Sequence, residues 1–261
     1  MGGAATKERT KHIKAIVPSA LFTKQTIQET STLTIPHIKQ DNMSHSQISP
    51  AIYYWGTPVV LISTQNEDGS SNIGPMSSAF WLGNRCILGL EFDSQTTINL
   101  LRTGECVLNL PSDDMIPTVN ALARTTGSNP MPDFKQANGY RYVKDKFAEA
   151  SLTAQTSEIV NVPRIEQCPV QMEARLVQRM TTKGGFLEII EVELLRTYVI
   201  DKIRMPGYKH RVDPDLWRPM IMSFQQLYGL REGGRTQESE ENYRALAPLP
   251  GGSEDSLPQE Q

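Results

Sequence analysis

Residues Thr57 to Leu110 read TPVVLISTQNEDGSSNIGPMSSAFWLGNRCILGLEFDSQTTINLLRTGECVLNL, and this stretch decides the fold. It contains a β-branched apolar run directly after Pro58, an extended piece from Asn72 to Ser78, and a nearly continuous apolar run from Cys86 to Phe92. The turn residues Asn66–Gly69 separate the first two pieces, since glycine adopts positive φ at little cost. The pattern predicts three strands of a largely buried sheet.

A short helix is predicted to follow the third strand. Ser94 is suited to cap its start, and Gly104 is suited to end it. Ile98, Leu101 and Thr97 are expected to share one buried helical face. A helix start rich in hydroxyls offers free backbone N–H groups at the positive end of the helix dipole, and such a position suits a phosphate.

The rest of the central region continues as strands with a few helices. Further strands are predicted at Cys106–Leu110, Val170–Arg179 and Phe186–Ile200, the last two as a hairpin. A helix capped by Ser112-Asp113-Asp114 is expected to run to about Ala123, followed by a loop from Thr125 to Phe134 and a partly helical segment from Lys135 to Ala150.

At these residues the sequence closely resembles the flavin reductase-like, FMN-binding split-barrel family. In that family a PMSS-F-x-LG segment contacts the isoalloxazine ring and an S-K-T-x-x-N-L segment contacts the phosphate; the counterparts here are Pro75–Gly83 and Ser94–Leu100. The resemblance continues in order to about Leu230 and includes Asp145–Phe147. It implies a mainly β fold with added helices, a six-stranded Greek-key split barrel, and a homodimer with FMN near the interface.

The resemblance also implies a set of cofactor-binding residues. Those expected at the ring are Met76, Ser77, Ser78, Phe80 and Trp81, and those expected at the phosphate are Ser94, Gln95, Thr96, Thr97 and Asn99. Helix capping is the alternative role for the hydroxyls, and core packing is the alternative for the two aromatic residues. Gln95 stands where the family often has Lys, so this chain lacks one cation at the expected phosphate site.

The implied function is an FMN-dependent NAD(P)H:flavin oxidoreductase, which transfers a hydride from NADH or NADPH to flavin. The isoalloxazine carries the redox chemistry, so the chain need only hold, orient and tune it. No catalytic residue is assigned, but His210 is a candidate contact for the substrate or nicotinamide; a structural loop histidine is the alternative. Electrons would pass to free flavin, oxygen or a partner monooxygenase. Two other functions stay open, namely an oxygenase or reductase that uses FMN directly on a small organic substrate and a non-catalytic flavin-binding protein.

Composition excludes several classes of protein. The 26 Lys and Arg residues against 29 Asp and Glu give a net charge of −3, which provides no basic field for nucleic acid. No apolar run is long enough to span a bilayer, so integral membrane association is not expected. The cysteines Cys86, Cys106 and Cys168 show no Cys-x-x-Cys spacing, and we expect reduced thiols and a cytoplasmic location. No metal site is expected, because His210 is the sole histidine of the central region.

Three segments are predicted along the chain: an N-terminal arm at 1–49 that is partly mobile, the FMN-binding domain at 50–230, and a disordered acidic tail at 231–261. Met1-Gly2 followed by Thr6 fits the N-myristoylation pattern, and lipidation of Gly2 stays open. No secretory signal is expected, because no apolar segment follows the basic residues near the start.

Overall fold

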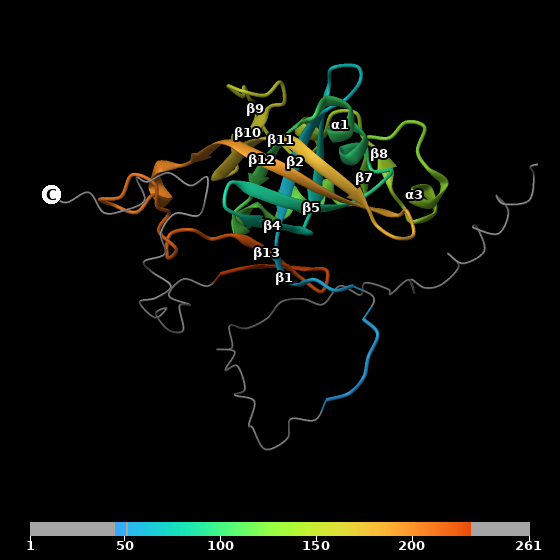
Figure 1. Ribbon diagram of the computed structural model, residues 1–261, viewed down its shortest axis with the longest axis horizontal. Helices are drawn as coiled ribbons and strands as arrows, with labels where there is room; N and C mark the ends of the chain where they lie inside the picture. Colours follow the sequence, from blue (N-terminus) through green and yellow to red (C-terminus); the bar gives the residue numbers. More distant parts are fainter. Residues whose placement is uncertain (1–44, 51, 231–261) are drawn as a thin grey trace, which may run out of the picture. The chain divides into compact units, whose positions relative to one another are not determined.

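The computed structural model describes residues 45–50 and 52–230 (Figure 1). The chain divides into two compact units, Met1–Ser49 and Pro50–Gln261, and the second carries all the elements described below. The predicted acidic tail, the possible lipidation site and nearly all of the predicted arm lie outside the described residues.

The main sheet is antiparallel and has seven strands in the order β3-β2-β6-β11-β12-β5-β4. They are β2 (Val60–Gln65), β3 (Ser71–Met76), β4 (Ala79–Leu82), β5 (Arg85–Glu91), β6 (Glu105–Leu110), β11 (Val170–Thr181) and β12 (Leu187–Val199). All but one correspond to a predicted strand with shifted bounds. The exception is β4, which the sequence pattern did not predict.

The main sheet must curl on itself. Its edge strands β3 and β4 are separated along the chain only by Ser77 and Ser78. The three peptide steps from Met76 to Ala79 span at most about 11 Å, so the two edges approach each other at this corner. Among the described residues no hydrogen-bonded ladder joins β3 to β4, so the curled sheet stays open there. The mainly β class with added helices is confirmed; the six-stranded Greek-key barrel is not confirmed in that detail, because the sheet has seven strands.

Smaller sheets surround this one. A three-stranded sheet contains β1 (Trp55–Pro58), β13 (Met220–Ser223) and β14 (Gln226–Gly229), and β1 and β13 lie below the main sheet in Figure 1. Two short pairs are formed by β9 (Ala154–Gln155) with β10 (Arg164–Ile165) and by β7 (Thr125–Thr126) with β8 (Arg141–Tyr142). The pair β7–β8 lies partly in the segment predicted as a loop.

Alternating side chains fill the inside of the curled sheet. Leu88 of β5 pairs with Ile190 of β12, Cys86 pairs with Val192, and all four are buried. Each fully buried aliphatic side chain of this kind contributes about 1.5–3 kcal/mol to folding. A second cluster on the outer side of β2 and β3 packs them against the helices that follow β6. Both faces of β2 are therefore covered, which explains its continuous apolar run.

The helices are short. They are α1 (Gln95–Thr103), α2 (Ile116–Leu122), α3 (Asp133–Ala137) and α4 (Lys146–Glu149), with 3₁₀ turns η2 (Asp113–Met115) and η3 (Asp201–Ile203). The helix predicted to run from the Ser112-Asp113-Asp114 cap to about Ala123 is divided into η2 and α2. Ser112 precedes η2, but its hydroxyl bonds to Asp114 and caps no backbone N–H group. Among the described residues no helix is long and apolar enough to cross a membrane.

The ends of α1 were predicted correctly, but its buried face was not. Ser94 caps the start, and Gly104 ends the helix with φ of 72°. Ile98 is 46% exposed, whereas Thr97 and Leu100 are fully buried. The buried face is partly polar because the first turn of α1 packs directly on β3: a Cβ added at Gly74 would lie 2.3 Å from Thr96 Oγ1. The expected face of Ile98, Leu101 and Thr97 is therefore wrong at Ile98.

Candidate functional site

A cleft of about 310 Å³ opens where β3, the end of β5 and the start of α1 meet. Residues around 122–127, α3 and α4 complete its walls, and Figure 1 shows α1, β7, β8 and α3 at the same end of the sheet. Four of the predicted cofactor-binding residues line the cleft: Met76, Ser94, Gln95 and Thr96. The fold thus brings the predicted phosphate segment and part of the predicted ring segment to one place.

The start of α1 offers two unused backbone donors. Ser94 Oγ accepts a hydrogen bond from the Thr97 N–H at 3.1 Å, so capping is the role that the geometry gives to this hydroxyl. Within residues 52–230 no hydrogen bond takes the N–H of Gln95 or Thr96. These donors stand at the positive end of a nine-residue helix that faces the cleft, and such an arrangement favours a bound anion.

Two predicted phosphate residues face away from the cleft. Thr97 Oγ1 donates to the carbonyl oxygen of Glu91 at 2.7 Å, which joins the end of β5 to α1. Asn99 Nδ2 donates to Thr64 Oγ1 at 3.1 Å and to Asn66 Oδ1 at 2.8 Å. Both side chains therefore hold α1 in place, and neither lines the cleft.

Cations from other parts of the chain line the cleft, although Gln95 itself carries no charge. Gln95 Nε2 donates to Asn99 Oδ1 at 2.9 Å, so its amide is held against its own helix. Arg124, Lys135 of α3 and Lys146 of α4 line the cleft, where Glu91 is the sole carboxylate among the lining residues. Lys135 is 5% exposed and Lys146 is 3% exposed. Burying two ammonium groups with so little negative charge is costly, which points to an anionic ligand.

Burial alters the proton affinity of one of these lysines. Burial, and to a lesser extent the neighbouring charge of Lys135, lowers the pKa of Lys146 from 10.5 to about 8. Lys146 Nζ donates to the carbonyl oxygen of Ile73 at 2.8 Å, which directs it toward β3. An anion in the cleft would oppose both effects and favour the charged form of Lys146.

Asn72 provides an independent sign of a polar ligand. Its side chain is 1% exposed and lines the cleft, and its Nδ2 donates to Thr64 and Thr96 at 3.2 Å each. Its Oδ1 is buried, and no described residue donates to it. Buried amide oxygens normally have a partner. If the Asn72 amide were rotated so that its oxygen and nitrogen exchanged places, the hydroxyls of Thr64 and Thr96 could donate to the oxygen, and the nitrogen would then be the atom without a partner. In either orientation one polar atom of this amide is left without a partner among the described residues.

The expected ring residues are divided by the alternation along β4. Trp81 packs on the core inside the curled sheet, and Phe80 is 59% exposed on the outside. Ser77 and Ser78 do not line the cleft either, but Ser78 Oγ hydrogen bonds to Tyr54 Oη at 2.9 Å, and Tyr54 does. The less polar part of the cleft is formed by Tyr54, Pro75, Met76 and Leu90. Core packing is thus the observed role of Trp81.

His210 lies in a different part of the molecule. It lines a separate groove with Tyr198, Arg204 and Arg211, after the end of β12. The structure therefore does not bring His210 to the cleft of its own chain. Within the described residues no group of three His, Cys, Asp or Glu side chains could hold a metal ion.

Sequence reasoning missed the cationic wall of the cleft. The resemblance at Asp145–Phe147 included Lys146, so a signal existed there, although it assigned no role. No local pattern marks Lys135 or Arg124, because Lys135 enters the cleft from α3 and Arg124 from the turn after α2, both far from α1 in the sequence.

A comparison with known families identifies the family of the chain. The family model described as "Flavin reductase like domain" matches residues 52–212. The chain belongs to this family. A relative, the uncharacterized protein YdfE of Bacillus subtilis (strain 168), is 36% identical over 204 residues, which are 77% of this chain and 98% of YdfE.

Solved structures share the fold. Flavoredoxin of Desulfovibrio vulgaris (Miyazaki F) has a TM-score of 0.62 at 18% identity, covering 78% of this chain and 100% of flavoredoxin. Component B of nitrilotriacetate monooxygenase from Bacillus cereus has a TM-score of 0.57 at 16% identity, covering 70% of this chain and 88% of the component. These are flavin reductase-like split-barrel proteins, and the open, curled sheet described above is the same architecture.

Family membership supports a flavin-related oxidoreductase activity of the flavin reductase kind. The residues of the cleft fit a flavin that carries a phosphate. Its wall contains two helix N–H groups, three cations and a buried amide with a free polar atom, and also Tyr54, Pro75, Met76 and Leu90.

Proposed function

We propose that this protein is an FMN-dependent NAD(P)H:flavin oxidoreductase. The observation that carries the proposal is the pair of nearly buried lysines, Lys135 and Lys146, in the same cleft as the free N–H groups at the start of α1. A phosphate monoester carries the charge that this site lacks, and of the common flavins FMN ends in such a group while riboflavin does not. Membership in the flavin reductase-like family supports the choice of a flavin.

The residues have distinct roles in this proposal. The N–H groups of Gln95 and Thr96 and the ammonium groups of Lys135 and Lys146 would hold the phosphate. Asn72 would direct its free polar atom to the same end of the ligand. Tyr54, Pro75, Met76 and Leu90 would contact the ring and exclude water from it. Bound FMN supplies the hydride-accepting chemistry, so the chain needs no general acid or base for that step.

We also propose a homodimer. The outer face of β4, β5, β12 and β11 carries exposed apolar side chains, namely Phe80, Leu82, Leu187 and Met180. Cross-strand pairing places them on one surface: Phe80 pairs with Ile87, and Ile189 pairs with both Gly89 and Met180. Exposed apolar surfaces of this kind usually mark contacts. Gly89 also lines the cleft, so a second copy on this face would lie beside the ligand.

Two further features of the proposal concern the cell. Similarity to component B of a monooxygenase supports electron delivery to a partner monooxygenase, with free flavin or oxygen as other acceptors. The three cysteines are free and buried, which fits the proposed reducing cytoplasm.

Reduction of the bound flavin by nicotinamide tests the proposal. The FMN-loaded protein is mixed anaerobically with NADH or NADPH, and the flavin absorbance is followed. We expect rapid bleaching by at least one of the two, and recovery of colour when free FMN or oxygen is admitted. Flavin that binds but bleaches with neither cofactor would leave a non-catalytic flavin-binding protein. Bleaching that requires a small organic substrate would instead indicate direct use of FMN on that substrate.

A further inference from the structure

A chain of hydrogen bonds runs from the turn between β2 and β3 to the wall of the cleft, and its first members can be oriented in one way only. Ser70 Oγ and the Ser70 backbone N–H both donate to Asp68 Oδ1, at 2.6 Å and 3.0 Å. These bonds, the side-chain bond first, hold the pKa of Asp68 below its usual value, so at neutral pH its carboxylate can only accept hydrogen bonds. The Ser70 hydroxyl proton is thereby used, and Ser70 Oγ can only accept from Asn66 Nδ2, which lies 3.0 Å away.

The orientation of Asn66 fixes that of Asn99. With its nitrogen turned to Ser70, Asn66 presents its Oδ1 to Asn99 of α1, whose Nδ2 lies 2.8 Å away and must be the donor. The same Nδ2 lies 3.1 Å from Thr64 Oγ1, so each of these two oxygens accepts one of its protons. Gln95 Nε2 donates to the oxygen of the Asn99 amide at 2.9 Å, which agrees with this orientation. Thr64 Oγ1 is thus an acceptor, and its own proton is available for another bond.

This proton decides between the two orientations of Asn72. The Asn72 amide lies 3.2 Å from Thr64 Oγ1 and 3.2 Å from Thr96 Oγ1, and its other polar atom has no partner among the described residues. If the amide nitrogen faced the two hydroxyls, neither hydroxyl proton would have an acceptor within the described part of the chain. If the oxygen faces them, both hydroxyls donate to it, since an amide oxygen can accept two hydrogen bonds. The second orientation satisfies more of the buried groups, and it leaves the nitrogen as the atom without a partner.

The nitrogen of Asn72 stands at the wall of the cleft. The atom of the amide that faces away from the two hydroxyls lies beside Gly127, where an added Cβ would be 2.8 Å from it. Asn72 and Gly127 both line the cleft, together with Lys135 and Lys146. The Asn72 side chain is 1% exposed and bonded to two hydroxyls, so it is held in place before a ligand binds. A donor fixed in this way loses little side-chain entropy on binding.

We propose that Asn72 presents an N–H donor to the cleft and is a specificity-determining residue that favours a ligand with an oxygen acceptor at this point. The inference rests on the proposed function in one respect, because it takes that acceptor to be a phosphate oxygen of FMN. It also divides the roles of Thr96, whose hydroxyl orients Asn72 and whose backbone N–H is left for the phosphate. Thr64, Asn66 and Asn99 are positioning residues that act through Asn72.

Nuclear magnetic resonance of the full-length, flavin-free protein tests the orientation of the amide. The side-chain amide signal of Asn72 is identified by its loss in Asn72→Asp. We expect a nuclear Overhauser effect between the Asn72 Nδ2 protons and the Cα protons of Gly127, because the structure places the two groups side by side. Nδ2 protons that show such effects only with Thr64 and Thr96, and none with Gly127, would overturn the inference. This result is read without any flavin, so it does not depend on the proposed function.

Titration with FMN and with riboflavin tests the contact with the ligand. FMN should shift the Asn72 Nδ2 signal, and riboflavin should leave it nearly unchanged. Asn72→Asp keeps the shape and still accepts from both hydroxyls, but it replaces the donor by an acceptor. FMN should therefore bind to this variant at least about tenfold more weakly, and riboflavin within about twofold of the parent. Asn120→Asp is the matched control, because it adds the same charge at an exposed position of α2 and should change neither affinity.

The possible failures of the two proposals differ. If FMN binds without shifting the Asn72 signal, or if Asn72→Asp weakens FMN and riboflavin equally or neither, the contact between Asn72 and the phosphate is overturned and the proposed function stands. If FMN does not bind at all, the proposed function and the phosphate contact are both refuted. The orientation of Asn72 is decided even then by the measurement on the flavin-free protein.

Discussion

Replacing Lys146 by methionine should change stability and cofactor affinity in opposite directions. Lys146 is 3% exposed, and burial together with Lys135 lowers its pKa from 10.5 to about 8. A shift of that size corresponds to about 3 kcal/mol of unfavourable free energy for keeping the side chain charged in the ligand-free protein. Methionine has a similar length and no charge, so the substitution removes this cost. It also removes the hydrogen bond to the Ile73 carbonyl oxygen, worth about 1 kcal/mol.

The net result for the ligand-free protein is a stabilisation of about 1–2 kcal/mol at neutral pH. The affinity for FMN should fall, because a hydrogen bond to a charged phosphate contributes about 1.5–3 kcal/mol, which corresponds to about 10- to 150-fold. Riboflavin has the same ring without the phosphate, so its affinity should stay within about twofold of the parent.

Stability is measured by urea unfolding of the flavin-free protein, and affinity by quenching of flavin fluorescence. Lys144→Met is the matched control, since Lys144 is an exposed lysine two positions earlier and pairs only with Asp68 at 3.8 Å in the described chain. It should change neither quantity. The reasoning is refuted if Lys146→Met destabilises the ligand-free protein, or if it weakens FMN and riboflavin equally.

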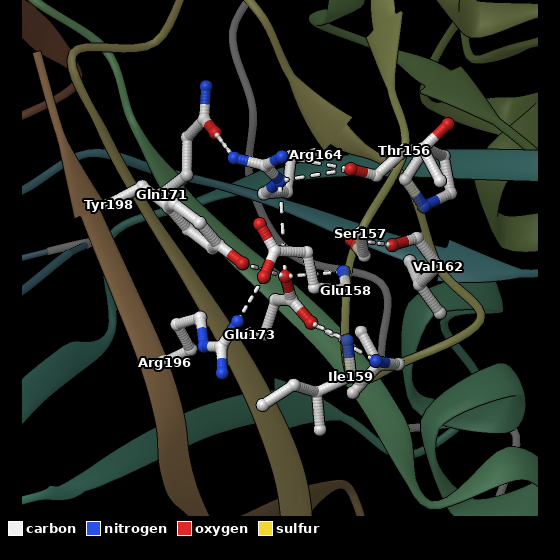
Figure 2. A network of polar contacts seen from close by, with 12 residues as sticks. Thr156, Ser157, Glu158, Ile159, Val162, Arg164, Gln171, Glu173, Arg196 and Tyr198 are labelled. Carbon is white, nitrogen blue, oxygen red and sulfur yellow. Dashed lines mark hydrogen bonds and ion pairs between the residues drawn. The ribbon is translucent and has the colours of Figure 1, made fainter.

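Three other predictions follow from the same contacts. Because the pKa of Lys146 is lowered to about 8, FMN affinity should decline as the pH rises above 8, while riboflavin affinity stays level. Over the same range up to about 10.5 the ligand-free protein should gain stability, since the unfolded chain binds more protons there. An FMN affinity that does not change from about pH 7 to 10 would contradict this. Thr96→Val keeps the shape beside Gly74 but removes the hydroxyl that forms a hydrogen bond with Asn72. Fluorescence titration should show that FMN binds at least about tenfold more weakly and that riboflavin binds about as before. An equal loss of affinity for both flavins would place the phosphate elsewhere. Burial raises the pKa of Glu173, but the backbone N–H groups of Glu158 and Ile159, the Tyr198 hydroxyl and the N–H of Val160 lower this pKa more. The carboxylate therefore stays charged, and its stabilising effect is lost only as the pH falls below the usual pKa of a glutamate. Glu173→Gln should lower the free energy of unfolding in urea by about 3–5 kcal/mol at pH 7, and a loss below about 1 kcal/mol would show that the network in Figure 2 is not a structural support.

The sequence predicted the parts of the fold that depend on local patterns. The apolar runs after Pro58 and from Cys86 to Phe92, and the hairpin signal between Val170–Arg179 and Phe186–Ile200, predicted main strands from local sequence alone. Ser94 and Gly104 marked both ends of α1 through capping chemistry alone. These features require no knowledge of distant contacts.

Tertiary contacts decided what the sequence could not. Ile98 is exposed although it is apolar, because the close approach of Gly74 to Thr96 directs a polar face of α1 inward. Phe80 and Trp81 follow each other in the predicted ring segment, yet β4 sends them to opposite faces. Lys135 lines the same cleft as Gln95 although it lies forty residues further along the chain, and no local pattern could reveal that proximity.

Equilibrium titration of the flavin-free parent protein with FMN and with riboflavin tests the central claim most directly. The two ligands differ only in the phosphate, for which the cleft offers two lysines, Arg124 and two helix N–H groups. The account predicts that FMN binds at least about 100-fold more tightly than riboflavin. Equal affinities for the two flavins, or no binding of either, would contradict it.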